Sequence, residues 1–188
     1  MKQLLLDIVK KNGVDAAAAL EQADIIYDRS FRDICVSNGC GRYGRNYMCP
    51  PDIGDADTLM NSARAFPHAI LYQTIHKIED SFDFEGMTNA KRMHIRCSAV
   101  IHSDIKGLGV RLLHLGAGAC GICERCAKLD SIPCRFPEDA LPSLEAYCVF
   151  VSETANNVGL KYINGENTVT YFGMILYGLP KLQAHKMA

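Results

Sequence analysis

The sequence predicts one domain of the α/β or α+β class, in which helices cover a small mixed sheet and two cysteine-rich loops lie on one side. Three observations lead to this prediction. The chain has 188 residues, which is long enough for one hydrophobic core. Segments of helical periodicity separate short segments with strand character near residues 25, 70, 112 and 170. Two further stretches, 35–51 and 116–137, contain clustered cysteines and fit neither pattern.

The composition is that of a soluble globular protein. Hydrophobic residues make up 48% of the chain and the formal net charge is −1, so we expect no nucleic-acid partner. The first apolar run contains Asp7 and ends at Lys10 and Lys11, which an export signal would not tolerate. No stretch has the length of a membrane span, so no membrane partner is expected. We therefore expect a cytoplasmic protein, whose nine cysteines are ligands or buried thiols rather than disulfides.

The first part of the chain is expected to contain two helices and a short strand. Apolar residues at helical spacing predict an opening helix that ends at Asn12-Gly13: Leu4, Leu5, Ile8 and Val9. The alanine-rich segment after it predicts a second helix to about Ala23. Residues 25–27 then predict a short strand that leads into the first cysteine-rich loop.

The middle of the chain predicts a helix, a buried strand and a loop. Asp55 and Asp57 favour a helix N-terminus, because acidic side chains stabilise the positive end of the helix dipole, and Pro67 ends this helix. Residues 69–72 predict a buried strand. The acidic segment 79–86 is expected to be a connecting loop, which is more commonly a solvated turn and is also the best candidate for a mobile or partner-facing insertion.

Residues 88–106 show the longest helical pattern, and Gly107 is a natural stop. The predicted apolar face consists of Met93, Cys97, Val100, Ile101 and Ile105. The position of Cys97 on this face favours a buried thiol. However, His94 and Cys97 also form an i, i+3 pair of potential metal ligands.

The last part of the chain predicts a strand at 110–115, a short helix at 152–158 and a strand or hairpin at 167–179. If the strand at 167–179 lay at the edge of the sheet, its apolar residues would favour pairing with a second copy, so a homodimer is compatible with this sequence. Cys148 lies in an apolar run and is expected in the core.

The stretch 116–137 carries the strongest sign of chemistry. Cys120, Cys123 and Cys126 form two C-x-x-C steps that share the middle cysteine, and Cys134 follows between two prolines. Such steps turn successive sulfurs toward one centre, which predicts a metal site. Structural zinc sites usually combine two separate C-x-x-C pairs, whereas three cysteines at uninterrupted spacing resemble the 4Fe–4S motif of bacterial ferredoxins. We expect a 4Fe–4S cluster here, with zinc as the alternative.

Three glycines in this stretch, Gly116, Gly118 and Gly121, also match the G-x-G-x-x-G pattern of dinucleotide-binding proteins. A dinucleotide site requires a long helix after the glycines, but two cysteines and then two prolines follow. The glycines are better explained as room for the backbone to pass close to a cluster.

The stretch 35–51 contains a second cysteine group, Cys35, Cys40 and Cys49, in the pattern C-x4-C-x8-C-P-P. These three thiols would supply three ligands of a second metal site, and no fourth ligand is obvious nearby. One or more of them could instead fill the core under the loop. Arg42 and Arg45 could neutralise the negative charge of a cluster or pair with carboxylates of a partner, and they equally fit a solvated basic loop tip.

Together these motifs resemble an uncharacterised bacterial and archaeal family described as predicted metal-binding, domain of unknown function 2284. The resemblance spans about Cys35 to Val151. It implies that metal is bound, without indicating a reaction, and neither Cys97 nor Cys148 belongs to its pattern. Seven cysteines carry over by position: Cys35, Cys40, Cys49, Cys120, Cys123, Cys126 and Cys134. The tract after the last cysteine also matches, at Arg135, Pro137, Pro142, Ser143 and Glu145.

We expect residues 1–188 to form a single metal-binding domain that holds one or two 4Fe–4S clusters, with a redox protein as its partner. The function would be electron transfer or a role in a redox enzyme, and in a two-cluster arrangement Cys134 could exchange with a member of the first group. A cluster with three cysteines would leave one iron open to substrate, which would make the protein an enzyme. The alternative is a zinc-binding structural or interaction module. The six histidines show no catalytic spacing.

Overall fold

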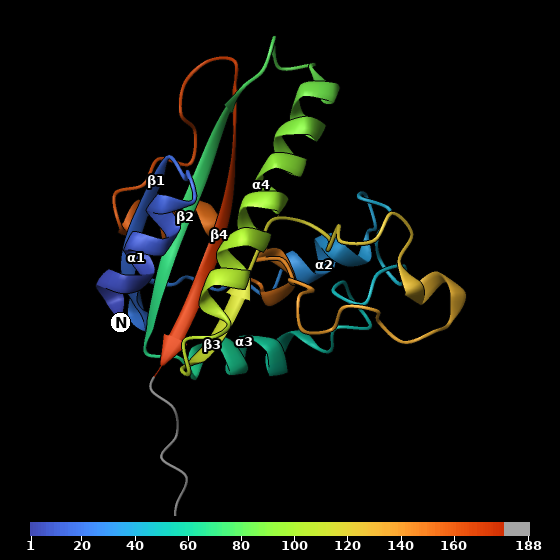
Figure 1. The fold of residues 1–188 in the computed structure, drawn as a ribbon. Helices are drawn as coiled ribbons and strands as arrows, with labels where there is room; N and C mark the ends of the chain where they lie inside the picture. Colours follow the sequence, from blue (N-terminus) through green and yellow to red (C-terminus); the bar gives the residue numbers. More distant parts are fainter. Residues whose placement is uncertain (179–188) are drawn as a thin grey trace, which may run out of the picture.

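Four strands form one antiparallel sheet in the computed structural model, which describes residues 1–178 (Figure 1). The predicted small sheet is therefore present, but all three strand pairings are antiparallel rather than mixed. Two long central strands pair from His68 opposite Tyr177 to Lys77 opposite Thr168. The order across the sheet is β1 (Ala16–Glu21), β2 (His68–Lys77), β4 (Thr168–Gly178) and β3 (Arg111–Leu115).

Helices cover both faces of this sheet. The α-helices are α1 (Lys2–Lys11), α2 (Phe31–Val36), α3 (Ala56–Arg64), α4 (Phe84–Ile105) and α5 (Val151–Asn157). Short 3-10 helices are η1 (Gln22–Asp24), η2 (Ala127–Asp130) and η3 (Glu145–Tyr147). None of the helices within residues 1–178 is both long and apolar enough to cross a membrane.

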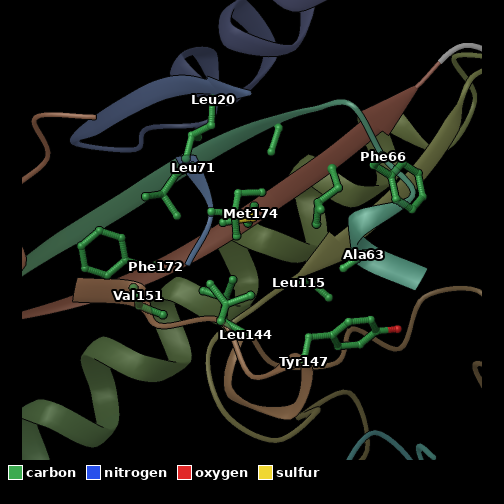
Figure 2. Close-up of a cluster of buried hydrophobic side chains, with 14 of the residues drawn as sticks. Leu20, Ala63, Phe66, Leu71, Leu115, Leu144, Tyr147, Val151, Phe172 and Met174 are labelled. Carbon is green, nitrogen blue, oxygen red and sulfur yellow. The ribbon is translucent and has the colours of Figure 1, made fainter. Parts of the chain in front are cut away.

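The apolar run of β2 is buried on both faces because its side chains alternate between two helical layers. Ala69 and Leu71 pack in a core that includes residues of α3 and α5 (Figure 2). Ile70 and Tyr72 point to the opposite face and pack in a second core with residues of α1 and α4. The sheet is thus the central layer of the molecule, and α4 runs along one of its faces (Figure 1).

Most predicted helices are confirmed, although some of their ends differ. α1 ends at Lys11 with Asn12 as its C-cap, and Gly13 follows with a φ of +81°. Asp55 caps α3, as its carboxylate accepts a hydrogen bond of 2.9 Å from the backbone N–H of Thr58. α5 and β3 lie within one residue of the predicted boundaries. α4 begins at Phe84, inside the predicted acidic loop, because Asp83 caps it by accepting a hydrogen bond from Gly86.

The prediction for the alanine-rich segment is wrong. Residues 16–21 form β1 rather than a helix, with Ala16 opposite Gln73 and Leu20 opposite Ala69. Pairing with β2 and packing under α1 outweigh the high helix propensity of alanine. The strand predicted at 25–27 is also absent, since Tyr27 forms only an isolated bridge with Val149.

Two other expectations need correction. Met93 and Val100 were placed on the apolar face of α4, but they are 57% and 51% exposed. The face toward the sheet instead contains the polar residues His94 and Ser98.

β4 lies between β2 and β3 and not at an edge of the sheet, so the argument for a homodimer from an exposed edge does not apply. The homodimer itself stays a prediction. Leu179, the last residue of that predicted strand, lies outside the described residues.

Candidate metal centre

Both cysteine-rich stretches lie in one irregular part of the molecule, here called the cysteine lobe and defined as residues 31–54 and 116–143. Figure 1 shows the two segments on the same side of α4, around α2. The amide of Asn46 donates to the carbonyl of Cys120 at 2.9 Å, and the hydroxyl of Tyr47 donates to the carbonyl of Ile132 at 2.8 Å. The two stretches are therefore joined directly, although they are far apart in the sequence.

An ion pair also joins the two segments. Lys128, in η2, pairs with the carboxylate of Asp52, and its ammonium lies 5.6 Å from the centre of the Tyr47 ring. Within the second segment, the guanidinium of Arg125 donates to Asp130 at 2.9 Å. Polar contacts therefore contribute to the cohesion of a region that contains little regular secondary structure.

The cysteines of the second stretch surround a common space. This cavity has a volume of only about 20 Å³, which is close to the space needed by one water molecule. Its walls also include Tyr47 and Met48 from the first segment. The cysteines that line it are Cys120, Cys123, Cys126 and Cys134.

The cysteines of the first stretch line a separate and larger cavity. Its volume is about 490 Å³, and its wall includes Gly118 and Ala119 from the second segment. Each predicted cysteine group thus faces its own space, and the two spaces share the backbone around Cys120 as a boundary. The cysteines in the larger cavity are Cys35, Cys40 and Cys49.

All nine cysteines are free thiols. As they are placed, no group of three or more His, Cys, Asp or Glu side chains within residues 1–178 has the positions needed to hold a metal ion. The structure therefore brings the thiols of each group to one cavity without arranging them as a formed coordination site. Metal binding would require side-chain rotations and loop adjustment, which this irregular backbone permits.

Burial keeps several of these thiols protonated. Burial, together with the neighbouring cysteines, raises the pKa of Cys49 to about 11, although Arg42 opposes the shift. Burial likewise raises the pKa of Cys35 and of Cys120. Because metals bind the thiolate, metal binding here would release protons.

Two cationic residues line the larger cavity. Arg42 belongs to the first segment, and Lys91 belongs to α4. The Lys91 ammonium lies against Gly118, where an added Cβ would be 2.5 Å from Nζ and the φ is +69°. The backbone conformation of this residue therefore favours glycine, whereas the lysine side chain is flexible and could move to make room for a Cβ. Lys91 carried no signal in the sequence, because only the packing of α4 brings it to the cavity.

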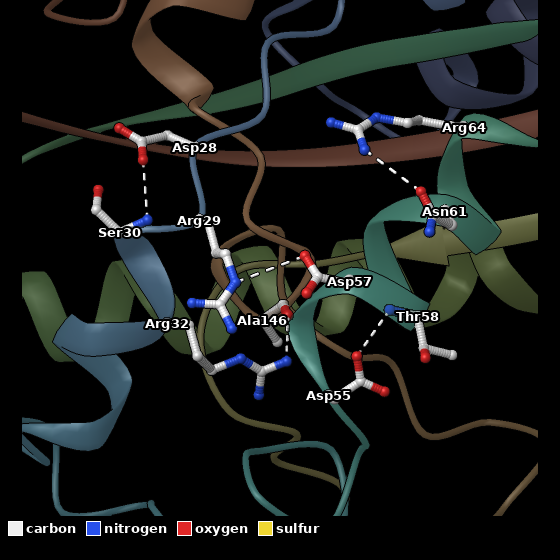
Figure 3. A network of polar contacts seen from close by, with 10 residues as sticks. All are labelled: Asp28, Arg29, Ser30, Arg32, Asp55, Asp57, Thr58, Asn61, Arg64 and Ala146. Atoms are coloured by element: carbon white, nitrogen blue, oxygen red, sulfur yellow. Dashed lines mark hydrogen bonds and ion pairs between the residues drawn. The ribbon is translucent and has the colours of Figure 1, made fainter.

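Glu145 also lines the larger cavity, at the start of η3. The polar contacts in Figure 3 fix the backbone around it: Arg32, in α2, donates to the carbonyl of Ala146 at 3.2 Å. Nearby, Arg29 pairs with Asp57 of α3 at 3.5 Å (Figure 3). The sequence indicated Glu145 only as part of the matching tract after the last cysteine, without a role.

The other cysteines and the histidine considered as metal ligands do not line either cysteine cavity: Cys97, Cys148 and His94. His94 is buried and contacts the hydroxyl of Thr74 at 2.9 Å, while Cys97 donates to the carbonyl of Asn12 at 3.5 Å. Cys148 is fully buried and packs in a small cluster of core residues, which confirms its prediction as a core thiol.

Comparison with protein families gives one match. The family described as "Predicted metal-binding protein (DUF2284)" matches residues 18–177, a range that contains both cysteine groups. No curated protein and no solved structure matches the chain.

Proposed function

Because the chain belongs to the family of predicted metal-binding proteins (DUF2284), we propose that its cysteine lobe binds two iron–sulfur clusters and transfers single electrons. One 4Fe–4S cluster would be held by the second cysteine group. Another would be held by the first group together with one further ligand. The residues of the second group are Cys120, Cys123, Cys126 and Cys134, and those of the first are Cys35, Cys40 and Cys49.

The observation that carries this proposal is the gathering of free thiols into two separate cavities of one lobe. Thiolates are soft ligands, which suit iron–sulfur clusters and zinc and suit magnesium or calcium poorly. The uninterrupted spacing of Cys120, Cys123 and Cys126 favours the cluster. A bound cluster would supply the redox chemistry by taking up and releasing one electron at a time.

The protein's own groups would hold and tune the cluster. Arg42 and Lys91 offset the negative charge of thiolates in the larger cavity, which favours the reduced state. Free thiols on both loops persist in a reducing compartment, so we place the protein in the cytoplasm. Electron transfer further requires a redox protein that docks near the lobe, and we expect neither nucleic acid nor a membrane as a partner.

One observation favours zinc as a second candidate. The space among the four cysteines of the second group is about 20 Å³, which is nearer to the size of a single ion than to that of a cuboidal cluster. Under this alternative the lobe is a structural or protein-interaction module that zinc holds in shape.

The two candidates are separated by metal analysis of protein purified without oxygen. We expect about eight irons per chain, about eight inorganic sulfides, and a brown absorbance that bleaches when dithionite is added. C123S and C40S should each remove about half of the iron, because they affect different groups. C97S is the matched control and should leave the iron unchanged, since Cys97 faces neither cavity. Zinc without iron would establish the alternative, and the absence of both metals would refute the proposal.

A further inference from the structure

The first cysteine group is one ligand short. Cys35, Cys40 and Cys49 supply three thiols, whereas a closed zinc site or a fully ligated 4Fe–4S cluster needs four protein ligands. The structure allows each other potential ligand of the larger cavity to be considered in turn. Arg42 and Lys91 also line it, but a guanidinium or ammonium group has no lone pair to offer a metal.

Glu145 is the acidic side chain on the wall of this cavity. Within residues 1–178, its Oε2 atom is buried and has no hydrogen-bond partner. Burying a carboxylate oxygen without a partner costs free energy, so such an atom in a folded protein needs an explanation. A metal ion bound at this oxygen would supply the partner that the buried atom lacks.

The backbone holds Glu145 in a fixed place. The segment before it is tied to Gly116, the residue that follows β3, because Gly116 donates to the carbonyl of Pro142 at 2.8 Å and accepts from the backbone N–H of Leu144 at 3.0 Å. The hydroxyl of Ser143 accepts a hydrogen bond of 3.1 Å from the backbone N–H of Ala146. Glu145 is therefore held in place by the backbone around it, and of the three cysteines Cys35 lies in α2, while Cys40 and Cys49 lie on an irregular loop whose adjustment would bring them to the metal.

We propose that Glu145 is the fourth ligand of the first cysteine group. This inference rests on the proposed function, because it assigns a residue to one of the two metal sites. Carboxylate oxygen is an established ligand of zinc and a harder donor than thiolate, so the metal atom that it binds would be the most readily exchanged of the site. Cys148 is a weaker choice although it neighbours Cys35, since it is fully buried and does not line the cavity.

An ion pair is the competing explanation for Glu145. The Nε of Arg32 is also buried without a partner, and Arg32 lies near Cys35. If Glu145 served only to neutralise Arg32, its replacement would lower stability and leave the metal content unchanged. The two explanations therefore predict different metal contents for a Glu145 variant, and metal content can be measured without an activity assay.

The test compares four proteins purified without oxygen: wild type, E145Q, E145C and E138Q. E145Q keeps the shape of the side chain but removes the anionic ligand, E145C restores a thiolate, and E138Q changes an exposed glutamate of the same lobe. Iron, zinc and sulfide content, electron paramagnetic resonance and melting temperature are measured for each.

We expect E145Q to lose about one to four irons per chain from the first site and to show the signal of a three-iron cluster in the oxidised state. E145C should restore the iron content, and E138Q should match wild type. If the protein holds zinc, E145Q should lower the zinc content by about one per chain and E145C should restore it. Unchanged metal in E145Q, with or without a lower melting temperature, would overturn the assignment to Glu145 and leave the proposed function standing. Wild-type protein with neither metal would refute both.

Discussion

β2 and β4 bury apolar side chains on both faces of the sheet, whereas the cysteine lobe leaves several of its apolar side chains in solvent. Ile70 and Ile175 are completely buried, but Ile34 and Val36 in α2 are 63% and 54% exposed. The sheet also carries continuous backbone hydrogen bonding, while the lobe consists largely of turns and bends. The difference indicates that hydrophobic burial stabilises the sheet more than the lobe, and we predict that bound metal contributes the additional stability of the lobe.

Shortening a buried side chain of β4 should have the largest effect on stability. Ile175→Ala removes an apolar side chain that is fully buried between α1 and α4, and we expect a loss of about 2–5 kcal/mol in the free energy of unfolding. Urea denaturation measures this loss. Ile34→Ala in the lobe is the control and should change stability by less than about 0.5 kcal/mol. Equal losses in the two variants would break the distinction between sheet and lobe.

Gly173→Ala tests how closely the sheet is packed. A Cβ at this position would lie 2.2 Å from the Tyr72 ring, and that ring is fully buried, so we expect a loss of about 1–3 kcal/mol. Gly107→Ala is the matched control, because its Cβ would meet no atom within 4 Å. Both variants can be followed by thermal denaturation. A stable G173A protein would mean that the core around Tyr72 is loosely packed.

Acid should destabilise the sheet through two buried histidines. Burial lowers the pKa of His94 to about 4 and that of His114 to about 3, from an ordinary value near 6.5. Between these values the unfolded chain binds more protons than the folded one, so stability is complete above about pH 6.5 and falls as the pH decreases toward 4. For each pH unit of this decrease, each histidine lowers the free energy of unfolding by at most about 1.4 kcal/mol.

The check is urea denaturation at several pH values for wild type and His94→Gln. The glutamine does not titrate, so the pH dependence of this variant should be weaker by the contribution of one histidine. An unchanged slope would show that His94 is protonated equally in the folded and unfolded chains.

The smallest effect is expected at the surface of the lobe. Lys128 and Asp52 form an ion pair between the two cysteine-rich segments. Because such pairs contribute little in water, Lys128→Met should speed metal loss to a chelator by less than about fivefold. A much larger acceleration would mean that this contact, and not the metal, holds the segments together.

The sequence predicted those parts of the fold that depend on local patterns. α3 and β2 follow from a capping aspartate and an apolar run, both of which are local signals. β1 could not be recognised, since a run of alanines has no alternation and its strand conformation comes from pairing with β2. The buried face of α4 was misassigned for a similar reason: His94 and Ser98 are buried because Thr74 and Tyr72 offer them hydrogen bonds across the sheet.

The candidate site shows the same limit. Cysteine spacing predicts two groups of ligands, and the structure places the residues of each group on the wall of one cavity, while their role as ligands stays a prediction. Lys91 and Glu145 reach the larger cavity only through the packing of α4 and the turn at η3, so no spacing rule could have placed them beside Cys35. Whether these cavities hold iron, zinc or another metal stays a prediction.

The central claim is that metal orders the cysteine lobe and not the sheet. Region-resolved hydrogen exchange, on protein as purified without oxygen and after removal of metal by a chelator, tests it most directly. We predict that metal removal abolishes amide protection in residues 31–54 and 116–143 and leaves β2 and β4 protected. Undiminished protection of the lobe without metal, or loss of protection throughout the molecule, would contradict the claim.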